Sequence, residues 1–141
     1  MKKLNALRKT FKYYNIDGYI VPKNDEFFGE YVNDSNDRLK FISSFTGSAG
    51  YALILRKKSY LFVDGRYTLQ AFKESGGKFK IVEIYKKKPS DIIDKLRKKI
   101  TIGYDPQLLT KSTTNNLFVS SKCNLKLIQE NLVDKIWNKK N

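Results

Sequence analysis

Histidine is absent from the 141-residue chain, and cysteine occurs once, at Cys123. Without histidine the chain has no imidazole base, no Ser-His-Asp triad and no histidine-containing metal site. A single cysteine builds neither a disulfide framework nor a thiolate metal cluster. We expect Cys123 to be a small buried hydrophobe, because no histidine can activate its thiol. The residue inventory therefore argues against an enzyme acting alone.

Long hydrophobic runs are also missing. No apolar segment approaches the roughly 20 residues that a membrane-spanning helix needs. The basic N-terminal stretch MKKLNALRKTFKYYN has no continuous apolar region and no small-residue cleavage site, so we expect no signal peptide. Together with the lone cysteine, these absences predict a cytoplasmic protein with no membrane contact.

Acidic residues are scarce, with 14 Asp and Glu against 28 Lys and Arg, for a net charge of +14. Such a balance first suggests nucleic acid as a partner. However, 23 of the 28 cations are lysines, spread from Lys2 to Lys140, whereas phosphate-binding faces usually favour arginine. We therefore favour a general basic surface. A free-standing basic domain that binds nucleic acid or acidic partners stays the alternative hypothesis.

Hydrophobic residues make up 40% of the chain, enough for the core of one domain, residues 1–141. Apolar spacing and turn residues predict helices that alternate with strands, which indicates an α/β fold with a mixed sheet flanked by helices. The expected strands are 19–21, 51–56, 60–63, 79–85, 101–104 and 124–128, with 51–56 and 60–63 as an antiparallel hairpin. The expected helices are 2–15, one capped by Asp34-Ser35 and reaching Phe45, 66–75, one opened by Pro89, 107–120, and a terminal turn or helix at 132–137.

Two polar segments could carry chemistry. GSAG at 47–50 lacks the spacing of a phosphate-binding loop, so a helix end followed by a tight strand entry is the simpler interpretation. The carboxylates Asp25, Glu26, Glu30 and Asp34 match no calcium-loop pattern. We interpret them as a polar surface loop and expect no metal-binding or catalytic residue in this chain.

The stretch VDGRY at 63–67 raises a sharper question. Asp64 suits a helix N-cap, and Gly65 permits a sharp corner between strand and helix. Arg66 then puts a cation in the first turn, against the helix dipole. Two explanations are open. Arg66 pairs locally with Asp64 at little cost, which physical chemistry alone slightly favours, or it is presented to a carboxylate or carbonyl outside the domain.

Six segments resemble, in order, the N-terminal domain of Xaa-Pro aminopeptidases of the creatinase/prolidase superfamily. They are YIVP (19–22), EYV (30–32), RLKFISSFTGSAG (38–50), LFVDGRYTLQA (61–71), IGYDP (102–106) and ENLVDKIW (130–137). The last segment is similar to the three-domain branch, in which it closes the first domain.

The resemblance implies a non-catalytic first domain of α/β type. Such enzymes remove an N-terminal residue that precedes proline, using two metal ions, usually manganese, in a C-terminal domain. The implied partners are therefore this chain's own further domains and a peptide substrate, and the isolated domain is expected to be a monomer. Carried over, the arginine of the D-G-R motif is Arg66, as a substrate-binding residue. Phe27-Phe28 stand where relatives commonly have His-Gln, a departure that affects any polar contact of that loop.

Overall fold

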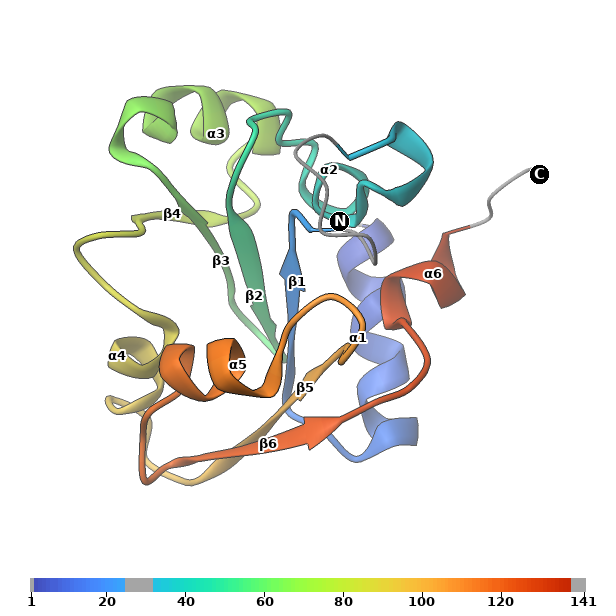
Figure 1. Cartoon of the computed structure of the whole chain (residues 1–141), viewed down its shortest axis with the longest axis vertical. Coiled ribbons are helices and arrows are strands. Elements are labelled where there is room, and N and C mark those ends of the chain that lie inside the picture. Colours follow the sequence, from blue (N-terminus) through green and yellow to red (C-terminus); the bar gives the residue numbers. More distant parts are fainter. Residues whose placement is uncertain (1, 25–31, 138–141) are drawn as a thin grey trace.

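A computed structural model describes residues 2–24 and 32–137, and its centre is a mixed six-stranded sheet (Figure 1). The strand order is β4-β3-β2-β1-β5-β6. Strand β2 pairs antiparallel with β1 and β3, while the pairs β1/β5, β3/β4 and β5/β6 are parallel. The strands are β1 (Gly18–Pro22), β2 (Tyr51–Leu55), β3 (Ser59–Val63), β4 (Lys80–Glu83), β5 (Ile100–Tyr104) and β6 (Cys123–Leu127).

Helices flank both faces of the sheet. They are α1 (Lys2–Tyr14), α2 (Arg38–Ser43), α3 (Thr68–Ser75), α4 (Pro89–Ile93), α5 (Lys111–Leu117) and α6 (Leu132–Ile136), with single 3-10 turns η1 (Asp34–Asn36) and η2 (Gly65–Tyr67). This arrangement confirms the predicted α/β class with a mixed, helix-flanked sheet. No helix in the described ranges combines the length and apolar character that crossing a membrane requires.

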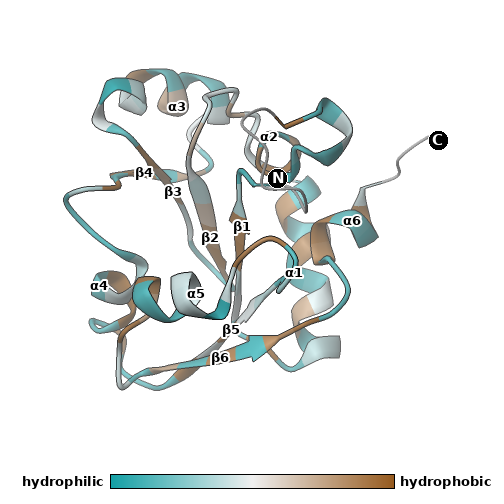
Figure 2. Cartoon of the chain, viewed as in Figure 1, coloured by the Kyte–Doolittle hydropathy of each residue, from teal (hydrophilic) through white to brown (hydrophobic). Residues whose placement is uncertain are grey.

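The two faces of the sheet build two hydrophobic clusters, because alternate side chains of a strand point to opposite sides. On β1, Tyr19 and Val21 join the cluster that α1, α2, α3 and α6 cover, whereas Ile20 joins the cluster that contains Ile93 of α4. Brown, hydrophobic residues accordingly lie along β1, β2 and β3 (Figure 2). The four inner strands β1, β2, β3 and β5 are therefore covered on both sides, whereas the edge strands β4 and β6 are partly exposed.

Several element boundaries differ from the prediction. Helix α2 is capped by Asp37, whose side chain accepts the backbone N–H of Lys40, and not by Asp34-Ser35. It ends at Ser43, since Ser44 adopts the left-handed conformation (φ 66°), so the buried Phe45 lies outside the helix. The predicted helix 107–120 contracts to α5, whose start is fixed by the Thr110 side chain accepting from Thr113 N–H.

Candidate functional site

The predicted D-G-R corner lies where β3 ends and α3 begins. Strand β3 ends at Val63, and the 3-10 turn η2 precedes α3, which starts at Thr68 and not at Arg66 as expected. Asp64 Oδ1 accepts the backbone N–H of Arg66 at 2.9 Å, so the predicted N-cap is confirmed. The capping bond fixes the direction in which the chain leaves the sheet.

Gly65 lies close to a side chain of the neighbouring strand. A Cβ built at this position would lie 2.5 Å from Oε1 of Glu83, at the end of the neighbouring strand β4. Glu83 is itself held by an ion pair with Lys86 at 2.8 Å. A larger residue than glycine would push this carboxylate aside, which costs little because it is the far end of a flexible, partly exposed side chain.

Arg66 makes the local contact predicted by the first explanation. Its Nε donates to Asp64 Oδ1 at 3.1 Å, and its guanidinium lies 5.4 Å from the ring centroid of Tyr67. The backbone N–H of Arg66, and then its side chain, hold the pKa of Asp64 below the ordinary value. The hydrogen bond to Asp64 in turn raises the pKa of Arg66. The cation at this helix start is therefore balanced within the turn itself.

The contact with Asp64 uses only part of the guanidinium. The Arg66 side chain is 77% exposed, against 28% for Asp64. Within the described residues its two terminal nitrogens make no hydrogen bond or ion pair. A guanidinium fork that is oriented through Nε and open at its far end can donate two parallel hydrogen bonds to a carboxylate or a carbonyl. The first explanation of Arg66, local pairing with Asp64, is therefore confirmed. The second explanation, contact with a group outside the domain, stays a prediction that the exposed end of the side chain permits.

The loop 44–50, next to this corner, is tied to α3. Glu74 accepts the backbone N–H of Thr46 at 2.9 Å and the Thr46 hydroxyl at 2.7 Å, and Gln70 donates to both partners. Burial disfavours the Glu74 carboxylate, but these hydrogen bonds outweigh it and lower its pKa. The sequence prediction missed this network, because nothing local connects residues 28 positions apart.

GSAG is part of that loop and not a helix end, since Ser44 already caps α2. Gly47 lies on the Phe45 ring, where a Cβ would come within 2.1 Å of Cζ. Gly50 has φ +149°, and a Cβ there would lie 2.8 Å from the carbonyl oxygen of Phe62. Both glycines let the backbone pack closely before β2, so the predicted tight strand entry is confirmed.

The predicted acidic loop offers little to test. Asp25, Glu26 and Glu30 lie outside the described residues, as does Phe27-Phe28. Asp34 is exposed and faces Lys40 at 3.4 Å. Among residues 2–24 and 32–137, no three His, Cys, Asp or Glu side chains are close enough to hold a metal ion.

Most polar residues of the resemblance motifs serve the fold. Arg38, nearly buried, donates two hydrogen bonds of 2.9 Å to Asp134, 96 residues away. Asn131 donates to the buried Asp105 at 2.8 Å, and Leu132 N–H donates to the Tyr19 hydroxyl at 3.3 Å. The first and last motifs are therefore joined in space. Only tertiary structure reveals this, although a cation among the apolar residues of α2 was a signal for a buried pair.

Cys123 begins the edge strand β6 and is half-buried. Burial raises the pKa of its thiol to about 11, with Lys99 opposing weakly. A thiol with this pKa is neutral at physiological pH and a poor nucleophile. The expectation of a small buried hydrophobe is therefore met only in part, because the side chain is half-buried.

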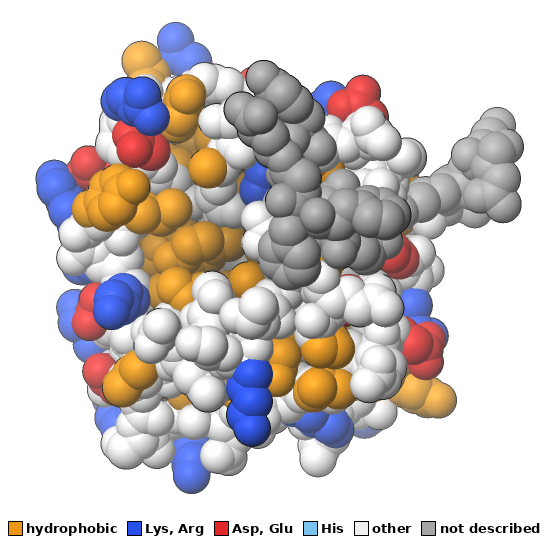
Figure 3. Space-filling model, viewed as in Figure 1, with side chains coloured by type: hydrophobic (Ala, Val, Ile, Leu, Met, Phe, Trp, Pro, Cys, Tyr) orange, Lys and Arg blue, Asp and Glu red, His pale blue; other side chains and the backbone are white. Residues whose placement is uncertain are grey.

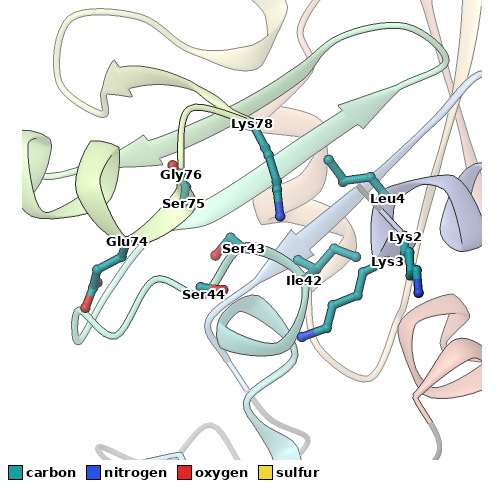
Figure 4. A pocket seen from close by; sticks show the side chains of 10 residues that line it. All are labelled: Lys2, Lys3, Leu4, Ile42, Ser43, Ser44, Glu74, Ser75, Gly76 and Lys78. Carbon is teal, nitrogen blue, oxygen red and sulfur yellow. The ribbon is translucent and has the colours of Figure 1, made fainter.

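A separate hollow of about 380 Å³ lies between the start of α1, the end of α2 and the end of α3 (Figure 4). Lys78 points into it, whereas Glu74 points away toward the loop 44–50 (Figure 4). The hydroxyls of Ser43 and Ser75 already donate to backbone carbonyls. The hollow is lined by lysines, serines and two apolar side chains, with Glu74 at its edge, and the described residues form no nucleophile–base pair there.

The surface around these features is mixed. On the face shown in Figure 3, Lys and Arg side chains are scattered over the rim, and apolar side chains gather between α3 and the helices α4 and α5. On that side of the sheet, Tyr51 stacks on Phe62 with ring centroids 4.9 Å apart. Burial raises the pKa of Tyr51 to about 12.

Fold and corner together define a mixed-sheet α/β domain that presents an outward-facing arginine at the end of a central strand. A family model described as the creatinase/prolidase N-terminal domain matches residues 3–133. The chain belongs to this family, as the sequence motifs predicted.

Similar proteins point the same way. The chain is 36% identical to the probable Xaa-Pro aminopeptidase P of Coprinopsis cinerea over 96% of its length, but it spans only 23% of that protein. A similar structure is the X-prolyl aminopeptidase of Caenorhabditis elegans, described as a cytosolic enzyme with a di-nuclear active site (TM-score 0.81, 27% identity, 96% of this chain and 25% of that chain). The N-terminal domain of the peptidase PepQ from Mycobacterium tuberculosis shares the fold (TM-score 0.71, 14% identity, 96% and 98% covered).

Proposed function

We propose that this chain is the non-catalytic N-terminal domain of an Xaa-Pro aminopeptidase and forms the substrate side of that enzyme's active site. Its homology to the N-terminal quarter of such enzymes supports the assignment. The observation that carries the role is Arg66, whose fork is oriented by Asp64 and open toward solvent. In this proposal the partners are the protein's own C-terminal domains and a peptide substrate, in a cytoplasmic enzyme.

The chain's own residues account for binding and not for hydrolysis. Two metal ions, manganese in this proposal, would activate water in the catalytic domain. The residues described here do not fit that group, because they assemble no cluster of carboxylate, imidazole or thiolate ligands. What remains for Arg66 is to donate hydrogen bonds to a carbonyl or carboxylate of the peptide and hold the peptide in register.

A chimera tests this role. Residues 3–133 replace the matching N-terminal segment of the Caenorhabditis elegans enzyme, and hydrolysis of an Xaa-Pro peptide is measured with Arg66, with Arg66→Ala and with Arg97→Ala. Arg97 is an exposed arginine outside the corner and serves as the matched control. We expect Arg66→Ala to lower kcat/KM by roughly 10- to 100-fold, the effect of one lost charge-assisted hydrogen bond. If all three chimeras have the same kcat/KM and native circular dichroism spectra, Arg66 has no role in substrate binding.

A further inference from the structure

An open groove of about 630 Å³ lies at the other end of strand β3 from Arg66. It runs between the β2–β3 turn, the start of β4 and helix α4 with the segment that follows it. Figure 1 shows α4 and α3 at opposite ends of β3, so this groove is separate from the D-G-R corner. Its volume falls within the range of about 300–1,000 Å³ that is usual for small-molecule sites.

The floor of the groove is apolar. It is formed by five side chains from three strands and the α4 region, namely Leu55, Tyr60, Ile92, Leu96 and Ile100. Leu55, Tyr60 and Ile100 are no more than 9% exposed, while Ile92 and Leu96 are half-buried. The floor is thus recessed, and an alkyl chain laid along it would leave water without opening the core.

The rim of the groove is strongly cationic. Six exposed lysines surround the floor: Lys57, Lys58, Lys80, Lys87, Lys95 and Lys98. Within the described ranges none of the six has a carboxylate partner. Arg56 completes the rim but pairs with Asp17 at 3.2 Å.

The groove's two carboxylates are already engaged. Asp17 also accepts the backbone N–H of Thr101 at 2.8 Å, and Asp91 accepts the backbone N–H of Lys88 at 2.8 Å. Neither of them neutralises a rim lysine. The rim therefore has an excess of positive charge that a bound anion would relieve.

We infer that this groove binds a free, single-chain amphipathic anion: an alkyl carboxylate whose chain lies on the apolar floor and whose head group meets the lysine rim. Lysine ammonium groups act as mobile point charges, which suit a small carboxylate without a fixed fork geometry. The occupant is small because the groove is small, and it is amphipathic because the floor and rim differ in polarity.

Two larger anionic partners fit less well. A nucleic-acid strand stacks its bases on exposed aromatic rings, and the one aromatic residue lining the groove, Tyr60, is only 8% exposed. A membrane surface is flat, so it would meet the lysines without reaching the recessed floor. Both remain outcomes of the test below.

The test is isothermal titration calorimetry of the full chain with sodium dodecanoate, kept below its critical micelle concentration, in 150 mM salt. We expect saturable 1:1 binding, with sodium butanoate at least about tenfold weaker because it lacks most of the chain. Dodecyltrimethylammonium should not bind. Equal affinity for butanoate and dodecanoate, or no saturable binding of dodecanoate, would overturn the inference.

Charge-reversal variants locate the site. The double variant Lys95→Glu/Lys98→Glu should weaken dodecanoate binding by about tenfold or more. The control is Lys9→Glu/Lys12→Glu, on the exposed side of α1, which makes the same change in net charge. Its affinity for dodecanoate should stay within about threefold of the wild-type value. Leu96→Gln probes the floor, with its fold checked by circular dichroism. If this variant does not fold, the surface pairs still decide. If both double variants lose the same affinity for dodecanoate, binding depends on net charge and not on the groove, which would overturn the inference.

Competition separates the anion classes. Oligo(U) and phosphatidylserine vesicles are added to the dodecanoate complex. The inference is supported if neither of them displaces dodecanoate at equal charge concentration. Displacement by oligo(U), or vesicle binding by a chain that ignores free dodecanoate, would instead identify a polyanion site or a membrane surface and overturn it.

Discussion

At the scale of single residues, Asp64 and Arg66 divide two tasks within three positions of the chain. The Asp64 carboxylate caps the turn that leads into α3 and also orients the neighbouring guanidinium. Asp64 orients the Arg66 side chain, but Arg66 adds little to the stability of the fold because most of its side chain is exposed to solvent. Stability and substrate contact are thus expected to separate by substitution.

In the isolated chain, Asp64→Ala should lower Tm by a few degrees, since it removes the N-cap. Arg66→Ala should leave Tm nearly unchanged. Thermal unfolding followed by circular dichroism measures both, with Arg97→Ala as the surface control. Unfolding by Arg66→Ala combined with a silent Asp64→Ala would mean that the two roles are assigned the wrong way round.

The same contact predicts a pH dependence. The folded-state pKa of Asp64 is depressed, so the ionised carboxylate stabilises the folded chain. This contribution to stability is fully present above the unfolded-state pKa. It is lost as pH falls through the lower, folded-state pKa. The Tm difference between wild type and Asp64→Ala should therefore be full at pH 6 and shrink steadily in acid. A difference that persists at pH 2 would contradict this assignment.

Cys123 should be slow to react. With its pKa at about 11, the thiol is almost wholly protonated at pH 8. We expect the native chain to react with a disulfide reagent several-fold more slowly than the chain in denaturant. Identical rates in both states would mean that Cys123 is neither buried nor shifted.

At the scale of elements, the loop 44–50 is held by α3 through Glu74. Thr46→Val removes the hydroxyl donor and leaves the backbone N–H in place. The pKa of Glu74 should then rise toward its ordinary value, measurable by carbon NMR of the carboxyl group. Thr113→Val, in α5, is the control and should not move it.

Local chemistry explains which elements were predictable. The hairpin of β2 and β3 follows from two apolar runs joined by the short segment Lys57-Lys58-Ser59, and the stop of α3 follows from Gly76, which adopts φ 65°. Asp64 could be predicted as a cap because its partner is two residues away. The strand order could not be predicted, since β1 pairs with β5 across some 80 residues. The Glu74 network likewise depends on tertiary placement.

Helix α2 also ends earlier than the spacing of its apolar residues predicted. Phe45 has the spacing of α2, but Ser44 turns left-handed and places it in the core by another route. Periodicity alone cannot detect such a stop, because it reports which side chains are buried and not which backbone carries them.

At the scale of the whole molecule, the chain matches the N-terminal domain of its family, and residues 2–24 and 32–137 bring no three potential metal ligands together. We predict that the isolated chain folds and hydrolyses no Xaa-Pro peptide, with or without added Mn²⁺. Release of the N-terminal residue is measured by chromatography, with a mock preparation as control. Sustained turnover by the purified chain, resistant to chelator, would contradict the assignment.

The Arg38–Asp134 pair joins distant parts of the molecule. Arg38→Met should destabilise the chain by about 2–4 kcal/mol in urea unfolding, less than a fully buried pair because Asp134 is partly exposed. Arg38→Met with Asp134→Leu should recover part of the loss, since both charged members of the pair are then removed. Lys40→Ala, which breaks an exposed pair, should leave the midpoint nearly unchanged. A silent Arg38→Met would exclude the pair as a structural tie.

The Arg38–Asp134 pair has a consequence for folding during translation. The guanidinium of Arg38 enters the nascent chain 96 residues before the carboxylate that satisfies it. At about 5–20 residues per second, it waits roughly 5–20 seconds on the ribosome without Asp134. Until then the two hydrogen bonds of 2.9 Å that join α2 to α6 cannot form. The nascent chain therefore stays open to chaperones and proteases until the segment around Asp134 emerges.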